Sequence, residues 1–276
     1  MTDNLKYTVL DGIKCYSPGV ASDYADYPDN GFDLTDKNAE SSFWVSSRNR
    51  LFKSIVEGHL LPTGKTKFLE IGCGTGDFIR QIANNEHLEI TGSEIYLKGL
   101  VYAKKNLPVV DFVQIDVTQG TIGKQFQIIT AFDVIEHIEN DTAAISNIGK
   151  MLEKHGTLII SVPQHMFLWS NLDEIVKHKR RYSRQELVTK LKNNGFEIIF
   201  ATSFVFVLFP LMFISRLFDK KNDQSRSDDR ALEKRVKFPW IVNAIFNLFM
   251  LIDEGLIKLG VSLPFGGTLV IVARKL

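Results

Sequence analysis

The chain has 276 residues, 45% of them hydrophobic and 24% charged, so it can bury a substantial core and is not disordered as a whole. Its formal net charge of +1 argues against broad electrostatic binding to nucleic acid. The two cysteines, Cys15 and Cys73, cannot form a disulfide framework, and the chain opens without a charged and apolar leader. These features predict a cytoplasmic protein.

The first 40 residues are rich in Asp, Tyr, Gly and Pro and show no sustained periodicity, so we expect an irregular cover over a site. A helix should follow, because apolar residues then recur at helical spacing until Pro62 stops them. Within this helix, Trp44 is expected either to pack in the core or to wall a ligand pocket. We therefore expect an N-terminal cover and helix over 1–62 and a main domain over 63–276.

From residue 65 onward, strand and helix patterns alternate. The strands are expected at 67–71, 89–93, 111–115, 128–132, 156–162, 197–203 and 268–273. The helices are expected at 76–84, 97–105, 142–152 and 183–194. This βαβα order predicts an α/β fold with a parallel, doubly wound sheet, right-handed crossovers and a ligand site at the carboxyl ends of the strands.

The first of these strands ends in the sequence E-I-G-C-G-T-G-D, residues 70–77. Gly72, Gly74 and Gly76 stand at alternate positions, which predicts a tight turn that a ligand can approach closely before a helix begins. A dinucleotide-binding motif would instead be G-x-G-x-x-G after a neutral strand end. Here Glu70 ends the strand, and its carboxylate suits a cationic ligand better than a pyrophosphate.

Acidic residues also end the next two predicted strands. Glu94 follows Gly76 by 18 residues, and Asp116 ends the third strand. A carboxylate at the end of the second strand can accept two hydrogen bonds from ribose hydroxyls. Either acid alone is weak evidence, but the two together with the glycine turn predict a nucleotide-type site at this edge of the sheet.

The E-I-G-C-G-T-G-D motif, with Glu94 and Asp116, resembles the cofactor site of class I S-adenosylmethionine-dependent methyltransferases. The resemblance implies a Rossmann-like sheet of seven strands, mostly parallel with the last strand antiparallel, helices on both faces and a helical insert before the last strand. It implies S-adenosylmethionine as the cofactor, with its adenine amino group near Asp116. The cofactor-binding residues that it implies are Glu70, Gly72, Cys73, Gly74, Gly76, Glu94, Ile95, Asp116, Val117, Phe132 and Asp133.

The fourth strand ends in D-V-I-E-H, residues 133–137, which is similar to the family's D-V-x-E-H segment beside the methyl group. His137 is therefore the candidate catalytic base, because histidine exchanges a proton near neutral pH. A base is needed only if the acceptor group is a hydroxyl or another protonated group. The alternative is that Glu136 and His137 simply begin a helix, where a carboxylate is favoured.

Beyond the fifth strand, residues 161–183 carry the segments V-P, L-W-S, D-E and H-x-R-R-Y-S. They resemble a bacterial subgroup of ubiquinone-type and glycan-associated methyltransferases. The substrate-binding candidates are Trp44, His165, His178 and Arg181. The basic residues could bind a phosphate or headgroup of the acceptor, or they could form a solvated face. An alternative is a metal site that gathers His137, His165, His178, Asp173 and Glu136, but these residues show no recognisable ligand spacing, so no metal is predicted.

An apolar helical insert is expected over 204–265. Residues 198–215 carry no charge, a polar stretch follows at 219–230, and a second apolar run with helical spacing spans 238–252. Both runs fall short of the roughly 20 apolar residues of a membrane-spanning helix. Three interpretations stay open: a helical hairpin that caps the core, a homodimer interface, or a monotopic contact with a lipid substrate or the inner face of the membrane.

We expect an S-adenosylmethionine-dependent methyltransferase that acts at oxygen on a small-molecule or lipid-linked acceptor, with no nucleic-acid partner. One alternative is a non-catalytic nucleotide-binding scaffold subunit, against which the intact glycine turn and both acids argue. Another is a protein or RNA methyltransferase. The nearly neutral charge and the apolar insert count against RNA, and the fourth strand lacks an N-P-P-Y type of segment.

Overall fold

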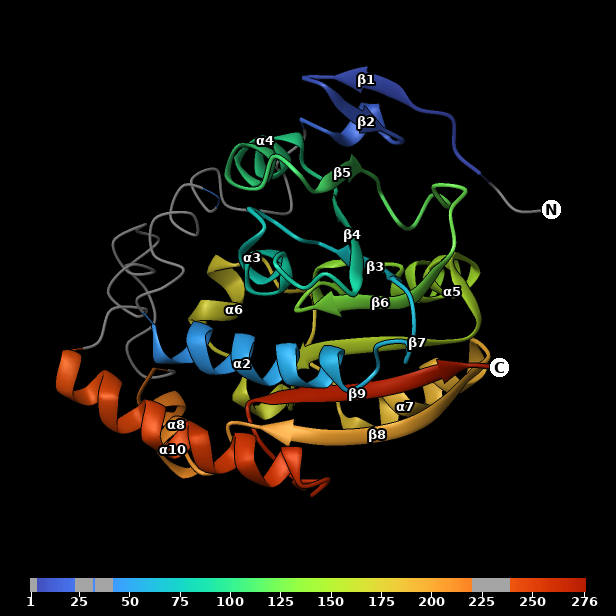
Figure 1. Cartoon of the computed structure of the whole chain (residues 1–276). Coiled ribbons are helices and arrows are strands. Elements are labelled where there is room, and N and C mark those ends of the chain that lie inside the picture. Colours follow the sequence, from blue (N-terminus) through green and yellow to red (C-terminus); the bar gives the residue numbers. More distant parts are fainter. Residues whose placement is uncertain (1–3, 23–31, 33–41, 220–238) are drawn as a thin grey trace.

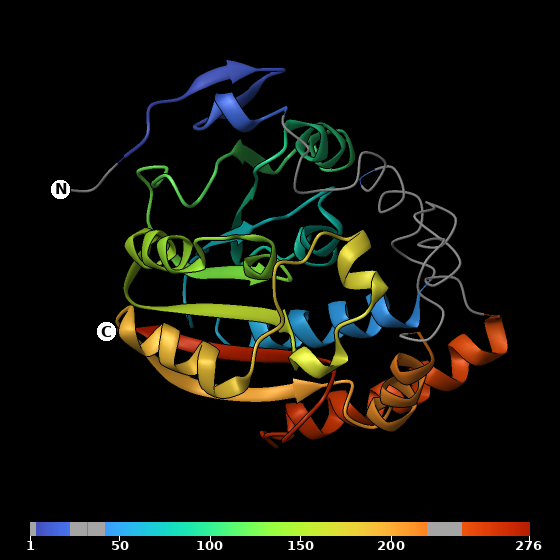
Figure 2. The same cartoon turned by 180° about the vertical axis from the view of Figure 1, so that it is seen from behind.

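A mixed sheet of nine strands organises the protein, for which a computed structural model describes residues 4–22, 32, 42–219 and 239–276 (Figures 1 and 2). The strand order across the sheet is β1-β2-β5-β4-β3-β6-β7-β9-β8. The strands are β1 (Thr8–Leu10), β2 (Ile13–Cys15), β3 (Thr66–Ile71), β4 (Leu88–Glu94), β5 (Asp111–Gln114), β6 (Phe126–Phe132), β7 (Leu152–Pro163), β8 (Phe196–Phe204) and β9 (Thr268–Lys275).

Helices connect these strands on both sides of the sheet (Figure 1). They are α2 (Phe43–Glu57), α3 (Asp77–Ile82), α4 (Leu97–Asn106), α5 (Asp141–Met151), α6 (Asn171–Ile175), α7 (Arg184–Asn193), α8 (Phe209–Asp219) and α10 (Trp240–Lys258). Three short 3₁₀ helices are η1 (Pro18–Val20), η2 (Ile135–His137) and η3 (Met166–Leu168).

The central strands of the sheet are buried on both faces. Their successive residues point to opposite sides, so each strand contributes to two cores. In β3, Phe68 packs in a core shared with α2, α3 and α10, whereas Leu69 packs with α5 and α7 on the other face. Strands β5, β4, β3, β6 and β7 are parallel neighbours. Strand β9 runs antiparallel between β7 and β8. The predicted Rossmann-like α/β fold is confirmed, including its antiparallel last strand.

Two strands at the N-terminus extend this sheet beyond the seven expected, so the expectation of an irregular segment was wrong at residues 8–15. Strands β1 and β2 form a hairpin, and β2 pairs in parallel with β5. The turn between them is Asp11-Gly12, and both residues have positive φ, of 50° and 72°. Asp-Gly is a strong sequence signal for a tight hairpin, but strands of three residues are too short to show a period.

A buried glutamine fixes the segment after this hairpin to the ends of the parallel strands. Gln114 Nε2 donates to the backbone carbonyls of Ser17 and Ile95, and its Oε1 accepts from the Ser17 amide. The first part of the chain therefore lies across the carboxyl ends of β4 and β5. Most of the remaining expected cover, residues 23–31 and 33–41, lies outside the described residues.

The insert between β8 and β9 contains α8 and α10, with residues 220–238 outside the described part of the chain. Helix α10 lies along α2 at the periphery of the molecule (Figure 1). Arg50 of α2 joins the two helices through hydrogen bonds to Glu254, at 2.6 and 3.1 Å, and to Asn247, at 2.8 Å. Glu254 is 2% exposed, so its charge depends on this partner.

Replacement of Arg50 tests how α10 is held. Arg50→Ala leaves the buried Glu254 without its partner, and we expect the free energy of unfolding in urea to fall by about 2 kcal/mol. Arg50→Ala combined with Glu254→Met removes the unpaired charge and should recover part of that loss. Equal stability of the wild type and the single variant would contradict this role.

Candidate active site

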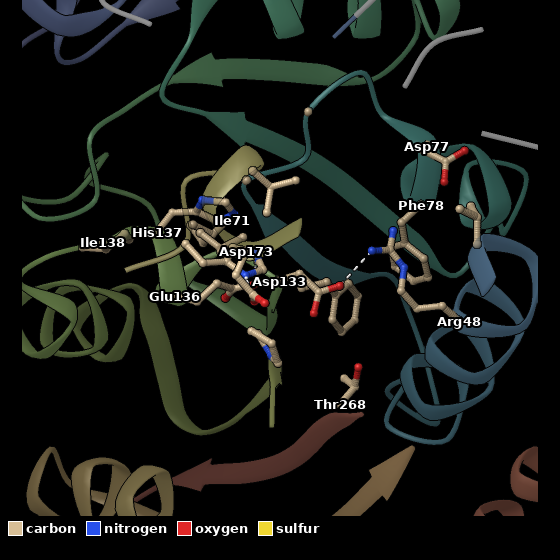
Figure 3. A pocket seen from close by; sticks show the side chains of 18 of the residues that line it. Arg48, Ile71, Asp77, Phe78, Asp133, Glu136, His137, Ile138, Asp173 and Thr268 are labelled. Atoms are coloured by element: carbon tan, nitrogen blue, oxygen red, sulfur yellow. Dashed lines mark hydrogen bonds and ion pairs between the residues drawn. The ribbon is translucent and has the colours of Figure 1, made fainter. Parts of the chain in front are cut away.

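A cavity of about 1320 Å³ opens at the carboxyl ends of the parallel strands. Its wall includes the glycine turn after β3, the ends of β4 to β7, the start of α2, and residues of α8 and α10. The strand order changes direction between β3 and β6, and a crevice at that point is where ligands bind in open α/β sheets. Figure 3 shows the part of this cavity near β6 and α2.

The three glycines of the turn have different functions. Gly72 has a φ of 70°, and a Cβ on it would lie 2.4 Å from Val134 Cγ2. Gly74 also has a positive φ, of 53°, but a Cβ there would meet nothing within 4 Å. Gly76 is the N-cap of α3 with a φ of 81°, and it does not line the cavity. Gly72 therefore permits packing on the next loop, Gly74 leaves space for a ligand, and Gly76 starts the helix.

The acids after β4 and β5 both line the cavity, and local hydrogen bonds hold their side chains. Glu94 accepts from the backbone amides of Gly74, Ile95 and Tyr96 at 3.1, 2.8 and 3.3 Å. Asp116 accepts from the Thr118 amide and hydroxyl and from Gln119. Burial raises the pKa of Glu94, and its three backbone donors oppose that rise. Each carboxylate keeps further lone pairs for ligand hydroxyl or amino groups.

Glu70 lies at the end of β3 with its carboxyl group in the cavity wall. It is 4% exposed, and its Oε2 has no hydrogen-bond partner among the described residues. Burial raises the pKa of Glu70 to about 8; the Arg48 charge opposes this rise, and the charges of Asp77 and Glu94 add to it. A buried carboxyl group of this kind favours either a proton or a cationic ligand.

Helix α2 contributes two polar residues that the sequence analysis did not select. Arg48 Nη1 forms an ion pair with Asp133 Oδ2 at 2.8 Å (Figure 3), and Ser161 Oγ donates to Asp133 Oδ1 at 2.9 Å. Asn49 Nδ2 donates to Asp77 Oδ2 at 2.9 Å. In the sequence, Arg48 and Asn49 stand out only as two polar residues just before the buried apolar positions of the same helix. The sequence does not show that their partners are Asp133 and Asp77.

A cluster of titratable groups lies beside the end of β6. Glu136 is fully buried, and neither of its carboxyl oxygens has a hydrogen-bond partner among the described residues. Burial, together with the charge of Asp133, raises the pKa of Glu136 well above its usual value. The His137 and His178 rings meet edge to face with centroids 4.8 Å apart, and His178 Nε2 is 3.8 Å from Glu136 Oε1.

Asp173 fixes the orientation of His178. Its Oδ1 is 2.8 Å from His178 Nδ1, and because a carboxylate only accepts, that nitrogen carries the proton. Burial would raise the pKa of Asp173, but hydrogen bonds from His178 and Arg181 hold it well below its usual value. Nε2 of a neutral His178 is then an acceptor that faces Glu136. Two such acceptors repel unless a proton or a cation lies between them.

The predicted substrate-binding residues do not all line the cavity. Trp44, His178 and Arg181 line the cavity, whereas His165 does not. Arg181 is 7% exposed and uses Nε and Nη2 on Asp173, at 2.8 and 2.9 Å, so much of its binding capacity supports the cluster. His165 stacks on Phe167, with ring centroids 4.8 Å apart. The remaining predicted site residues, apart from Gly76, line the cavity as well.

The donor groups of this cluster are also those that divalent metal ions use. Glu136, His137 and His178 each present one ligand atom, and these atoms lie within 4.8 Å of one another. No ligand spacing predicted this group, because His178 reaches it from a loop about 40 residues further along the chain.

Comparison with known proteins gives the family. A family profile described as "Methyltransferase domain" matches residues 37–200. The chain is 24% identical over 160 residues to the ubiquinone biosynthesis O-methyltransferase of Rickettsia canadensis, across 52% of this chain and 67% of that protein. The match to the Rickettsia typhi ubiquinone biosynthesis O-methyltransferase spans 44% of that protein. The chain is 26% identical to the ubiquinone/menaquinone biosynthesis C-methyltransferase UbiE of Campylobacter jejuni, across 54% of this chain and 78% of that protein.

Solved structures share the fold. The [4+2]-cyclase SpnF superposes with a TM-score of 0.55 and 20% identity, over 90% of this chain and 86% of that one. Magnesium protoporphyrin IX methyltransferase from Synechocystis PCC 6803, solved with bound S-adenosylhomocysteine, gives a TM-score of 0.52 and 18% identity, over 67% of this chain and 92% of that one. At these identities the likeness shows the fold alone.

The fold and the family match define an S-adenosylmethionine-dependent methyltransferase of class I. The chain belongs to the methyltransferase-domain family, with S-adenosylmethionine as the cofactor. The described residues fit this group. The space beside Gly74 admits a ligand against the turn, and the unpartnered oxygen of Glu70 suits a cationic group.

Alanine at the first two glycines should separate stability from binding. Gly72→Ala forces a methyl group against Val134, and we expect a loss of about 2–3 kcal/mol in the free energy of unfolding. Gly74→Ala has open space and should lose only about 1 kcal/mol, from its positive φ. Calorimetric titration should nevertheless show weaker cofactor binding by Gly74→Ala. A larger loss of stability in Gly74→Ala than in Gly72→Ala would contradict these assignments.

Cofactor binding should be linked to proton release from Glu70. Below about pH 8 the unliganded pocket keeps this carboxyl group protonated, and a cationic ligand favours the ionised form. Affinity should therefore rise as the pH rises toward 8. Titrations near neutral pH, in buffers of different ionisation enthalpy, should show the release of a fraction of a proton.

The matched control is Glu70→Gln, which keeps the shape of the side chain but cannot ionise. It should bind S-adenosylmethionine more weakly, with no proton release from this site and little pH dependence. Binding by the wild type that takes up protons, or that does not change between pH 6.5 and 8.5, would argue against Glu70 as the group in contact with the cationic cofactor.

Proposed function

We propose that the protein transfers the methyl group of S-adenosylmethionine to a hydroxyl oxygen of an acceptor that has a large apolar part. The observation that carries the proposal is that two kinds of wall meet in one cavity. The histidine cluster at His137 and His178 provides proton-accepting groups. Leu208, Met212 and Phe246 provide an apolar wall from the insert. Such a cavity suits an acceptor with a hydroxyl at one end and a hydrocarbon portion at the other.

The cofactor supplies a methyl group bound to a positively charged sulfur, which an oxygen can attack in line. The protein has to hold the acceptor oxygen close to that methyl group and remove the hydroxyl proton. In this proposal His137 would take the hydroxyl proton as the oxygen bonds to the methyl carbon, and the bond from that carbon to sulfur would break with its electron pair left on sulfur. The Asp173 carboxylate, which is hydrogen-bonded to His178, favours the positive charge that results on the imidazole pair.

The fold by itself does not fix the reaction, since one of the similar structures is named a [4+2]-cyclase. Support for oxygen as the methylated atom comes from the imidazole groups beside the cavity, which a reaction at a deprotonated nitrogen or a thiolate would not need. The ubiquinone biosynthesis O-methyltransferase match agrees with this acceptor chemistry. The scaffold alternative predicts cofactor binding without turnover.

The direct test uses methyl-labelled S-adenosylmethionine with a panel of acceptors analysed by mass spectrometry. The panel should contain hydroxylated quinol-type lipids, short water-soluble phenols and lipid-linked sugars, together with protein and RNA controls. Label on the oxygen of an apolar acceptor is the expected result. Label on carbon, nitrogen, protein or RNA would overturn the proposal, as would tight cofactor binding with no turnover on any acceptor.

Variants of the histidine cluster test the proton transfer. His137→Ala should lower kcat by about 100-fold or more, with cofactor affinity retained, because the acceptor loses its base. His165→Ala is the matched control, because His165 lies outside the cavity wall and should leave the rate nearly unchanged.

Asp173→Asn tests the orientation of His178 without removing a ring. It should lower kcat by about 10-fold and alter the pH profile, while KM for the cofactor stays the same. All of these assays should be run both with and without a metal chelator. Activity that vanishes with the chelator and returns with a divalent ion would instead make Glu136, His137 and His178 metal ligands and would contradict the role of His137 as a base.

A further inference from the structure

Helix α10 has its polar residues on the inside. Asn243 Oδ1 accepts from the Phe43 amide at 2.7 Å, and Asn247 and Glu254 bind Arg50 of α2. Asp253 is fully buried, and its two oxygens accept from the amides of Phe206 and Val207 at the start of the insert. These polar residues, together with Met250 and Ile257, form the stripe by which the helix is docked on the rest of the protein.

The opposite side of α10 is apolar and faces solvent. Between the helix start and Gly255, every exposed residue is apolar, and the side chain of Leu248 is 62% exposed. Lys258 is the first exposed charge along the helix. We name as the apolar face the exposed residues of α10 that are apolar: Trp240, Ile241, Ala244, Ile245, Leu248, Phe249, Leu251 and Ile252. An amphipathic helix on the surface of a soluble protein has the opposite arrangement, with its polar side facing solvent and its apolar side facing the core.

Further exposed apolar side chains lie on α8, and aromatic residues of η3 and of the segment after α10 pack against that helix. Leu211, Phe213 and Ile214 of α8 are exposed, and the ring of Phe213 lies 6.0 Å from that of Phe167. Phe265 follows α10 in sequence, and its ring lies 5.1 Å from Phe209 at the start of α8. Figures 1 and 2 place α8 and α10 at the same edge of the molecule. Exposed apolar area of this extent marks a contact surface.

We propose that this face docks on a lipid bilayer, with α10 lying in the plane of the membrane. Its 19 residues are apolar enough to cross a membrane by length and composition. However, Asn243, Asn247 and Glu254 repeat along one side at helical spacing, and all three form hydrogen bonds with residues of α2. The helix is therefore held along its length against the protein. Only its outer face can enter the apolar region of a bilayer, as in monotopic helices.

The cavity explains why a bilayer fits this face better than a protein partner. Leu211 is half exposed and also lines the cavity, and Met212, Ser215 and Phe246 of the same two helices line it too. Helices α8 and α10 therefore carry both cavity-lining residues and exposed apolar residues, although no residue of the apolar face itself lines the cavity. A protein seated on both would close the entrance, whereas a bilayer would deliver an acceptor with an apolar tail directly into it. The exposed side of α10 also lacks the polar groups with which protein interfaces form about one hydrogen bond per 100–200 Å².

Trp240 marks the end of α10 nearest the polar stretch of the insert, and its side chain is 80% exposed. Tryptophan is favoured at the boundary between headgroups and acyl chains, which suits a helix that lies at that depth. The apolar face is the larger part of this contact, so binding should not depend on anionic lipid. Entry of a lipid-linked acceptor rests on the proposed function, whereas binding of the protein to lipid does not.

The test is flotation of the full-length protein with vesicles of phosphatidylcholine, and with vesicles that also contain phosphatidylglycerol, at low and high salt. The wild type should float with both kinds of vesicle at both salt concentrations. Leu248→Glu/Ile252→Glu places charges on the apolar face and should lower the bound fraction by at least about 10-fold. Val101→Glu/Val109→Glu is the matched control, since it makes the same change at exposed positions on and after α4 and should float like the wild type.

Circular dichroism and cofactor binding should be the same for both double variants, so that loss of flotation cannot come from unfolding. Absence of flotation by the folded wild type would overturn the proposal. So would a dimer in light scattering that Leu248→Glu/Ile252→Glu dissociates, because the face would then join two copies of the chain. Flotation that Leu248→Glu/Ile252→Glu abolishes, combined with no methyl transfer to any apolar acceptor, would support the membrane contact and contradict the proposed function alone.

Discussion

Carboxyl groups buried at the carboxyl ends of the strands are the constraint on which this site depends. Glu70, Asp77 and Glu94 surround one glycine turn, and the charges of the other two add to the effect of burial on Glu70. Arg48 is a protein cation that opposes this effect, and it reaches the site only because α2 packs across the strand ends. A cationic cofactor bound here would favour the ionised form of Glu70. The same carboxyl groups that destabilise the unliganded pocket therefore make it selective for positive charge.

A second buried carboxyl group follows the same principle at the other end of the cavity. Glu136 has no donor among the described residues, but His137 and His178 lie beside it. Asp173 accepts a hydrogen bond from Nδ1 of His178, and Arg181 forms an ion pair with Asp173. This chain of contacts leaves the other His178 nitrogen available on the cavity side. A histidine ring is thereby placed in the same cavity as the apolar wall of the insert, which is the arrangement on which the proposed reaction at a hydroxyl rests.

Local sequence signals predicted the elements of this fold well, because each central strand is a buried run bounded by turn residues. The glycine turn and the acids at strand ends were found for the same reason, since the topology brings strand ends together. The contacts between Arg48 and Asp133, and between His178 and Glu136, were not found, because they join segments that are distant in sequence. Helix α10 shows a further limit. Its apolar period was recognised, but the period does not tell which side faces the protein, and here the polar residues do, because each has a specific partner there.

The place of the insert in the sheet has a consequence for how such a protein can change its substrate. Phe204 at the end of β8 pairs directly with Thr268 at the start of β9, so the two ends of the insert are neighbours in the sheet. A short turn could join those strands without altering their register. The sheet register alone therefore does not depend on the insert, whereas α10 also packs on α2, the helix that carries Arg48 to the site. Substitutions at the cavity-lining residues of α8 and α10 can therefore alter the cavity wall of the insert while the pairing of β3 to β9 stays the same.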